Sequence, residues 1–363
     1  MDTEILIAGA GLAGLSLAAS LQKLGMNYRL VEARDRFGGR ILTSRKAGAN
    51  DADVAADLGP SWIWPGQAQV AALLGQLGLG VFEQYSDGRL VYEDELGQVR
   101  RDLDYSSMAG SLRIEGGVAS LTDALAAKLD SEFIHLSHRL RSIRKTEHGY
   151  LVDLEYPGGR TQMRARKVVL AIPPRLIANL IAFEPALPSD AIEKMRSIPT
   201  WMAGQAKFFA FYDEPFWRKQ GLSGDAISRR GPLMEIHDAC GKNPEHGVLF
   251  GFVGQEPGSG AREPSSLTGQ AVRQLAKLFG PQAENPLGTC LQDWAREEYT
   301  ATTADQAISQ HPSYGLPSVL EALAQQDIFF ASSEMAPLFG GFIEGALEAS
   351  RAVLERLRAD TRF

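Results

Sequence analysis

Cysteine is scarce in this chain. Only Cys240 and Cys290 occur among its 363 residues, and their spacing matches no paired-cysteine motif. This excludes a disulfide scaffold or a zinc site built on cysteine, and it fits a reducing compartment. Positive charge is also in short supply, because 37 Lys and Arg stand against 44 Asp and Glu, for a net charge of -7. An acidic chain without a basic run argues against a nucleic-acid partner and against an anionic membrane surface.

The sequence contains one long apolar run, from Ile5 to Leu21. Asp2 and Glu4 precede it where a signal peptide would carry positive charge, and the run is short for a membrane span. No other stretch is apolar enough to span, so we expect a cytoplasmic chain without a membrane partner. The length predicts two or three domains, and 44% hydrophobic with 22% charged residues is typical of a globular protein.

A nucleotide-binding pattern explains this apolar run better. Residues 5–8 form a short apolar stretch typical of a buried parallel strand, and Gly9, Gly11 and Gly14 follow before a helical pattern begins. In such a pattern Gly9 permits the tight turn, Gly11 lets the backbone approach a pyrophosphate, and Gly14 allows close packing of helix and sheet. The N-terminus of the helix then offers N–H groups to the phosphates.

An acidic residue stands at the distance that this pattern requires. A second predicted strand, residues 28–31, ends at Glu32, roughly 20 residues past the third glycine, where a carboxylate can accept hydrogen bonds from ribose hydroxyls. Gly38, Gly39 and Arg40 follow, and NAD binding does not need this second glycine pair. It would let more backbone approach a pyrophosphate, with a charge-assisted contact from Arg40. The alternative for Arg40 is a solvent-exposed arginine.

Several segments resemble the flavin-containing amine oxidase family, which includes monoamine, polyamine and L-amino-acid oxidases. They are GAGLAGL at 9–15, EARDRFGGR at 32–40, DLGPSWIWP at 57–65 and SSEMAPLFGGFIEGA at 332–346. The resemblance covers nearly the whole chain and implies an FAD cofactor. The cofactor contacts that it implies are Gly9, Gly11, Ala13, Gly14, Glu32, Ala33, Arg34, Gly39, Arg40, Gly59, Pro60, Ser61, Leu140, Ser333, Glu334, Gly341, Phe342 and Ile343.

The last motif also predicts a helix with an electrostatic role. Gly341 opens a long helical pattern that continues through Leu357. The positive N-terminal end of such a helix would stabilise the negative charge of a reduced flavin. From the residues alone, Glu334 is an N-terminal helix carboxylate and Phe342 is ordinary core.

The remaining pattern predicts an α/β fold with two domains. Residues 133–172 are strand-like, with separate strands expected at 162–166 and 168–172. Their order resembles the family's second FAD-binding segment, in which the region of Leu140 passes the adenine. The expected domains are a discontinuous Rossmann-like FAD-binding domain of residues 1–65, 111–180 and 291–363, and a substrate-binding domain with a mixed sheet and helices, of residues 66–110 and 181–290.

Lys207 is the sharpest candidate for chemistry. Period-2 alternation over residues 205–212 places it on the strand face of Phe209 and Phe211. A lysine there either reaches solvent at an edge, as most strand lysines do, or is held inside beside a polar group. AKFFAFYDEPFW at 206–217 resembles the family's lysine-bearing strand, and the resemblance implies that Lys207 holds a water at flavin N5.

Trp294 matches the family's tryptophan beside the flavin, although on the residues alone it is equally a core anchor. The monoamine branch has a cysteine that attaches FAD covalently, but residues 299–304 contain none, so we expect non-covalent FAD. That branch also places two aromatic rings around the amine, and the matching positions here are Ala304 and Phe342. Other aromatic residues that could line the pocket are Trp62, Trp64, Trp201 and Tyr314.

The predicted function is an FAD-dependent oxidase that transfers hydride from an amine C–H to flavin N5, giving an imine, then a carbonyl product, with O2 reduced to H2O2. Lys207, Trp294 and Phe342 are the expected catalytic-site residues. Two alternatives stay open: a flavin oxidoreductase of the same fold on a non-amine substrate (protoporphyrinogen oxidase-like, desaturase-like or renalase-like), and a non-catalytic FAD-binding protein. No metal site is expected, because His135 and His138 have no third ligand nearby. The particular amine and the oligomeric state are left open.

Overall fold

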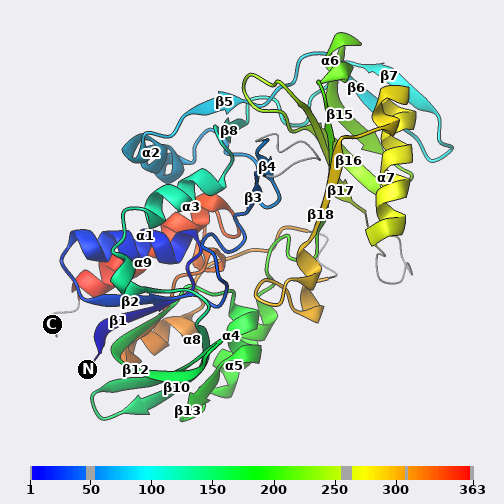
Figure 1. The fold of residues 1–363 in the computed structure, drawn as a ribbon. Helices are drawn as coiled ribbons and strands as arrows, with labels where there is room; N and C mark the ends of the chain where they lie inside the picture. The colour runs from blue at the N-terminus through cyan, green and yellow to red at the C-terminus, as the bar shows by residue number, and fades with distance from the viewer. Residues whose placement is uncertain (1, 46–53, 255–263, 307–309, 360–363) are drawn as a thin grey trace.

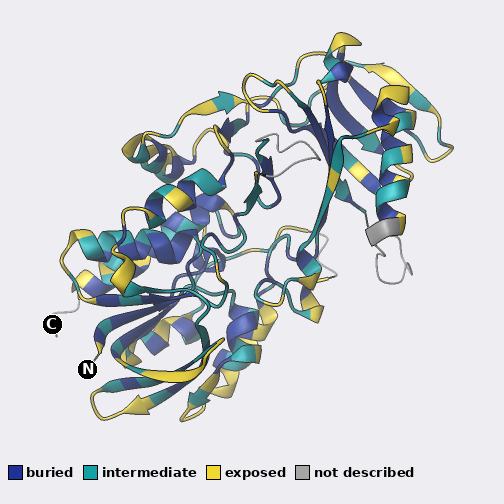
Figure 2. Cartoon of the chain, in the orientation of Figure 1, coloured by how far each residue is buried: buried dark blue, intermediate teal, exposed yellow. Residues whose placement is uncertain are grey.

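The computed structural model describes residues 2–45, 54–254, 264–306 and 310–359. Two β-sheets, each packed against helices, form the two halves of the molecule, and the chain passes between them several times (Figure 1). Figure 2 shows buried strands at the centre of each half and exposed residues on the outward faces of the helices. Within the described residues, no helix is long and apolar enough to cross a membrane.

The first sheet has eight strands around a parallel centre. β1 pairs in parallel with β2 and β12, and β12 pairs in parallel with β19. β1, β2, β19 and the second part of β12 are buried along almost their whole length, as expected for parallel strands that are covered on both faces. The strands are β1 (Thr3–Ala8), β2 (Tyr28–Val31), β9 (Ile134–His135), β10 (Arg139–Thr146), β11 (Gly149–Tyr156), β12 (Gly159–Leu170), β13 (Ala182–Glu184) and β19 (Ile328–Phe330).

Helices cover both faces of this sheet. One core contains Leu15 from α1, Val70 from α2, Leu121 from α3 and Leu347 from α9. Residues from α4, α5 and α8 pack in a second core on the other face. The helices are α1 (Leu12–Lys23), α2 (Ala68–Leu77), α3 (Ala119–Ala126), α4 (Pro174–Leu180), α5 (Ser189–Ser197), α8 (Ser318–Glu321) and α9 (Ile343–Ala359).

The second sheet has seven strands in the order β18-β14-β17-β16-β15-β6-β7. The long helix α7 packs on its outer face, and Phe209, Phe211 and Phe250 gather on the inner face. The elements of this half are β6 (Arg89–Glu93), β7 (Val99–Leu103), β14 (Ala206–Tyr212), α6 (Phe216–Lys219), β15 (Leu222–Ser228), β16 (Leu233–Asp238), β17 (Gly247–Val253), α7 (Pro264–Phe279) and β18 (Gly288–Asp293).

Two short ribbons lie between the sheets: β3 (Thr43–Ser44) pairs with β4 (Ala56–Asp57), and β5 (Val81–Glu83) pairs with β8 (Leu112–Ile114). The predicted α/β class is confirmed, with a Rossmann-like parallel centre in the sheet of one half and a mixed sheet in the other. The strand and helix predicted around the first glycines are confirmed as β1 and α1.

The structure corrects the prediction of two strands over residues 162–172. β12 is one continuous strand, whose first part pairs with β11 and whose second part pairs with β1. Lys167 is a charged residue beside an apolar run, and this change in pattern led to the prediction that the strand ends there. Its side chain is 1% exposed, and its ammonium pairs at 3.0 Å with Asp327, so a lysine fits inside the sheet.

Several segments pack with the other half from the one that the predicted boundaries imply. α2 joins the core of the first sheet through Val70 and Leu74, α5 packs on the other face of that sheet, and β13 pairs with β10. The last residues of β18, 291–293, instead pair with β14 in the second sheet. Short apolar segments carry no signal for which sheet they join, because either one would bury them equally well.

The glycine turn gives a prediction about stability. A Cβ on Gly14 would lie 1.9 Å from the carbonyl oxygen of Gly9, so α1 could not keep its place against β1. Gly14→Ala should lower the free energy of unfolding by about 1–3 kcal/mol, measured by denaturant titration. Gly75→Ala in α2 is the matched control, because a Cβ there meets nothing within 4 Å. It should leave stability unchanged or raise it by about 0.5–1 kcal/mol; equal effects of both changes would contradict the packing argument.

Candidate active site

A cavity of about 500 Å³ lies between the two sheets and takes its walls from both. This volume is within the ordinary range for ligand sites. The structure brings most of the predicted site residues into this one wall, from positions far apart in the sequence. They are Gly9, Gly11, Ala13, Glu32, Ala33, Arg34, Gly39, Arg40, Gly59, Pro60, Ser61, Leu140, Lys207, Trp294, Ser333, Gly341, Phe342 and Ile343.

Gly14 and Glu334 do not belong to the described wall, although both were predicted to contact a cofactor. Gly14 packs against the back of the Gly9 turn. Glu334 is fully buried behind Arg40 and forms an ion pair with it at 2.7 Å. Both residues therefore support the wall from behind.

Two glycine turns face each other at one end of the cavity. Gly9 has a φ of +105°, and Gly38 and Gly39 have φ of +95° and +59°, which other residues rarely adopt. Gly11 and Gly38 form an isolated parallel bridge, and a Cβ on Gly39 would stand 3.4 Å from the Cα of Gly11. α1 begins at Leu12 without a side-chain cap, so its first N–H groups keep no side-chain partner. This end of the cavity is suited to a phosphate group.

Glu32 lies beside these turns at the end of β2 and is 6% exposed. One carboxylate oxygen accepts a hydrogen bond from the Ala10 N–H at 2.7 Å, and the other accepts one from the Arg34 N–H at 2.9 Å. Each carboxylate oxygen can accept a second hydrogen bond. Glu32 can therefore hold the glycine turn and still accept from hydroxyl groups in the cavity.

Arg40 presents a fixed positive charge to the same end. Its guanidinium pairs with Glu334 at 2.7 Å and donates to the Ser333 hydroxyl at 3.0 Å. Burial alone would lower the pKa of Arg40, but the Glu334 carboxylate offsets this and holds the pKa above its ordinary value. The arginine is therefore oriented from behind while it lines the cavity.

Lys207 lies in β14 on the inner face of the second sheet, and it is 5% exposed. Its ammonium donates to the carbonyl oxygen of Gly59 at 2.6 Å, to the Ser61 hydroxyl at 2.8 Å and to the carbonyl oxygen of Asp57 at 3.2 Å. Burial lowers the pKa of Lys207 from 10.5 to about 7. With this pKa, the charged and neutral forms of Lys207 are both populated near neutral pH. Of the two environments that the sequence left open for Lys207, solvent at a sheet edge or the interior beside a polar group, the structure shows the interior.

Aromatic rings complete the surroundings of this ammonium. Lys207 Nζ lies 4.6 Å from the ring centre of Phe250, 5.3 Å from that of Phe252 and 5.8 Å from that of Trp62. Ring faces attract a cation and displace water from it. Trp62 and Phe252 also line the cavity, so they form an aromatic wall beside the lysine.

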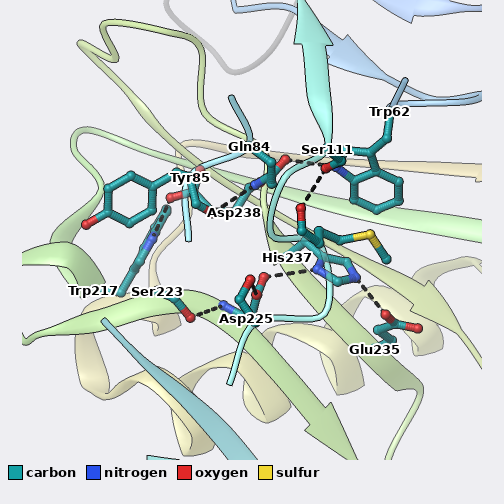
Figure 3. A network of polar contacts seen from close by, with 12 residues as sticks. Trp62, Gln84, Tyr85, Ser111, Trp217, Ser223, Asp225, Glu235, His237 and Asp238 are labelled. Carbon is teal, nitrogen blue, oxygen red and sulfur yellow. Dashed lines mark hydrogen bonds and ion pairs between the residues drawn. The ribbon is translucent and has the colours of Figure 1, made fainter. Parts of the chain in front are cut away.

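A buried polar network supports this wall from behind (Figure 3). His237 is fully buried, and its ring nitrogens lie 3.0 Å from the carboxylates of Asp225 and Glu235. Burial would lower the pKa of His237, but the two carboxylates raise it above its ordinary value. The His237 ring meets Trp62 edge to face at 5.1 Å and lies 5.3 Å from Phe250. The network therefore fixes the rings that surround the lysine.

Trp62 is also held by its indole nitrogen. The Nε1–H donates to the side-chain oxygen of Gln84 at 2.9 Å, and the Gln84 amide donates to the carbonyl oxygen of Asp238 at 2.8 Å. The Asp238 carboxylate in turn accepts from Trp217 at 2.9 Å. These bonds reach from the cavity wall into the core of the second sheet (Figure 3).

Trp294 follows β18 directly and is 5% exposed. Its indole N–H donates to the carbonyl oxygen of Leu58 at 2.9 Å, next to the carbonyl groups that hold Lys207. Phe342 is 41% exposed and lines the cavity, so it is not the core residue that its sequence alone suggested. Ala304, which matches the second aromatic position of the monoamine branch, is not among the described residues that line the cavity. The ring that stacks on Phe342 is that of His311, with ring centres 5.0 Å apart.

Sequence reasoning missed several wall residues. Trp62, Trp64 and Trp201 do line the cavity, as was suggested, but Tyr314 lies behind His311. His138 also lines the cavity, but the sequence analysis considered it only as a metal ligand, because of its HxxH spacing with His135. No group of three metal-binding side chains occurs in the described part of the chain. Wall residues that were not predicted for the site include Gln67, Met108, Arg139, Leu176, Met202, Gln205, Phe252, Tyr299, Thr300 and His311.

The lowered pKa of Lys207 gives a prediction about stability and pH. In the unfolded chain this lysine stays protonated to about its ordinary 10.5, but in the folded protein it loses its proton near 7. Folding then releases a proton between these values, so stability should rise with pH. Relative to Lys207→Met, the wild-type unfolding free energy should increase by up to about 1.4 kcal/mol per pH unit from pH 7 to 9.

Denaturant titrations of both proteins at pH 7, 8 and 9 measure this difference. Lys219→Met is the control, because Lys219 is 70% exposed and pairs with Glu214 at the surface. Its difference from wild type should be flat across the same range. A flat difference for Lys207→Met as well would mean that the buried lysine keeps an ordinary pKa.

Comparison with known proteins identifies the family of this chain. The family described as flavin containing amine oxidoreductase matches residues 12–102 and 96–356. Putrescine oxidase of Kocuria rosea is 25% identical, with 97% of this chain and 94% of that protein covered. The structure of a wild-type putrescine oxidase bound to putrescine matches with a TM-score of 0.80 at 21% identity, covering 99% of both chains. Cyclohexylamine oxidase from Brevibacterium oxydans matches with a TM-score of 0.79 at 22% identity, covering 99% of this chain and 100% of that one. The chain therefore belongs to the flavin-containing amine oxidoreductase family.

Proposed function

We propose that this protein is an FAD-dependent oxidase that removes a hydride from the carbon beside the nitrogen of a small amine with an apolar body. The observation that carries the proposal is Lys207, buried in the wall of a cavity whose opposite end is built from two facing glycine turns. FAD would accept the hydride at its flavin ring and pass the electrons to O2, giving H2O2, while the imine product hydrolyses to a carbonyl compound. The cytoplasmic location stays a prediction.

The cavity fits FAD at its nucleotide end. The uncapped N-terminus of α1 and the Arg40 guanidinium would hold the pyrophosphate, and Glu32 would accept from the ribose hydroxyls. Cys240 and Cys290 both lie outside the described wall. This supports a non-covalently held cofactor, as the sequence predicted.

The residues at the other end would prepare the amine. An amine can donate hydride only when its nitrogen is uncharged, and a dry apolar site lowers the pKa of an ammonium group. Trp62, Phe252 and Trp201 supply apolar surface there. Lys207 is held by three oxygen partners, of which the carbonyl oxygen of Asp57 at 3.2 Å is the most distant. Giving up that contact would free one N–H to hold a water or a polar atom of the substrate. No separate base is required, because the neutral amine already has its lone pair.

An anaerobic screen tests the proposed reaction. The purified protein should be yellow and should release FAD on denaturation. Among amines, amino acids and reduced nicotinamides, a monoamine should bleach the flavin, and readmitted air should restore the colour with formation of H2O2. Bleaching only by a non-amine would replace the proposal with a same-fold oxidoreductase on a carbon-centred substrate. Bound FAD that nothing bleaches would indicate a non-catalytic protein.

Loss of the Lys207 ammonium should impair the reaction while FAD stays bound. Lys207→Met should slow flavin reduction by the amine, or reoxidation by O2, at least tenfold in stopped-flow measurements, because the polar group at the reacting end is removed. FAD content should be unchanged, since the pyrophosphate end is built from other residues. Lys219→Met, at an exposed position, should react like wild type. Unchanged rates in Lys207→Met would assign this lysine a structural role only.

A further inference from the structure

Residues 294–300 connect the two ends of the cavity. They follow β18, which pairs with the strand of Lys207. Trp294 anchors one end of this segment, since its backbone N–H donates to the carbonyl oxygen of Gln205 at 3.0 Å. At the other end Tyr299 and Thr300 line the cavity together with Glu32, where the proposed function places the ribose. The segment thus runs from the second sheet to the part of the cavity wall that contains Glu32.

Two arginines hold Tyr299 at this end. The guanidinium carbon of Arg34 lies 5.5 Å from the centre of the Tyr299 ring, and that of Arg139 lies 5.4 Å from it. Arg34 also donates to the Thr300 hydroxyl at 2.9 Å. A guanidinium group within about 6 Å of an aromatic ring centre is attracted to the ring face. The ring is therefore held from two elements that are distant in the sequence.

Each arginine has an acidic partner on the same segment. Arg34 pairs with Glu297 at 3.3 Å, and Arg139 pairs with Glu298 at 2.7 Å. Glu297 and Glu298, which are consecutive, thus bind the segment to the loop after β2 and to the start of β10. To open this end of the cavity, the segment must break both ion pairs and both ring contacts together.

Arg139 has a further polar atom directed into buried space. Its Nε is buried, and among the described residues it has no hydrogen-bond partner. Arg139 lines the cavity next to His138 and Leu140. An atom with almost no accessible surface faces protein and not the cavity, so Arg139 meets the cavity through the rest of its side chain, which is 20% exposed.

We propose that Tyr299, held between Arg34 and Arg139, closes the ribose end of the cavity over the adenosine half of the dinucleotide and slows its release. This rests on the proposed function, in which the dinucleotide is FAD. The Tyr299 ring and the accessible part of the Arg139 side chain together offer an apolar face and a positive charge to a group with hydroxyls and ring nitrogens. With both cysteines outside the described wall, retention of the cofactor depends on such contacts.

The test measures retention of FAD and binding of ADP, which contains only the adenosine and pyrophosphate part. FAD should leave the Tyr299→Ala holoenzyme at least tenfold faster after dilution, followed by the flavin signal. ADP should bind the flavin-free variant at least tenfold more weakly by calorimetry, a loss of about 1.4 kcal/mol. Arg139→Gln should act in the same direction. Tyr299→Phe keeps the ring and should behave like wild type.

Arg296→Gln is the matched control on the same segment, because Arg296 pairs with Asp293 and lies outside the described wall. Unchanged FAD release in Tyr299→Ala, with flavin still bleached by an amine, overturns the closing role and leaves the proposed oxidase intact. Faster FAD release with unchanged ADP affinity also overturns it, since the segment would then act at the flavin end. If Tyr299→Ala does not fold, Arg139→Gln is judged by the same criteria. Wild-type protein that binds neither FAD nor ADP refutes the oxidase and the closing role together.

Discussion

The ammonium of Lys207 is the contact on which the arrangement of the site depends. It belongs to the second sheet, but its three oxygen partners belong to residues 57–61, which approach from the nucleotide-binding half. Burial of a charge costs several kcal/mol unless hydrogen bonds and nearby charges compensate for it. Three acceptors and the surrounding ring faces offset part of this cost, and the remainder lowers the pKa of Lys207. The two halves are thereby joined through the group that faces the cavity.

The two ends of the cavity use different parts of the chain. At the end where we propose that the nucleotide binds, the groups facing the cavity are mostly backbone, because glycine turns let N–H groups come close to a phosphate. At the other end they are side chains, with a lysine among aromatic rings that the His237 network holds in place. Backbone recognition suits a cofactor whose pyrophosphate is constant. Side-chain recognition allows the substrate to differ between relatives that share the fold.

The glycine spacing, Glu32 and the alternation around Lys207 predicted much of the site, because each depends on residues that are close together in the sequence. Gly9 needs a positive φ and Gly14 needs close packing within one turn of helix, so local rules suffice. The break that was predicted at Lys167 was wrong because continuity of the strand there depends on a residue that is distant in the sequence. Its partner, Asp327, stands far along the chain, and no local pattern reveals that the charge is paired.

By itself, the sequence determined the nucleotide-binding turn, the parallel centre of the first sheet and the strand that carries Lys207, since hydrophobic period and glycine placement act over a few residues. Only the tertiary structure decided that Lys207 is buried, that Glu334 stands behind Arg40, and that Tyr299 meets Arg34 and Arg139. It also decided which sheet α2, β13 and β18 join. These outcomes depend on contacts between segments that are distant in sequence, and the free energy of such contacts exists only after the two halves have come together.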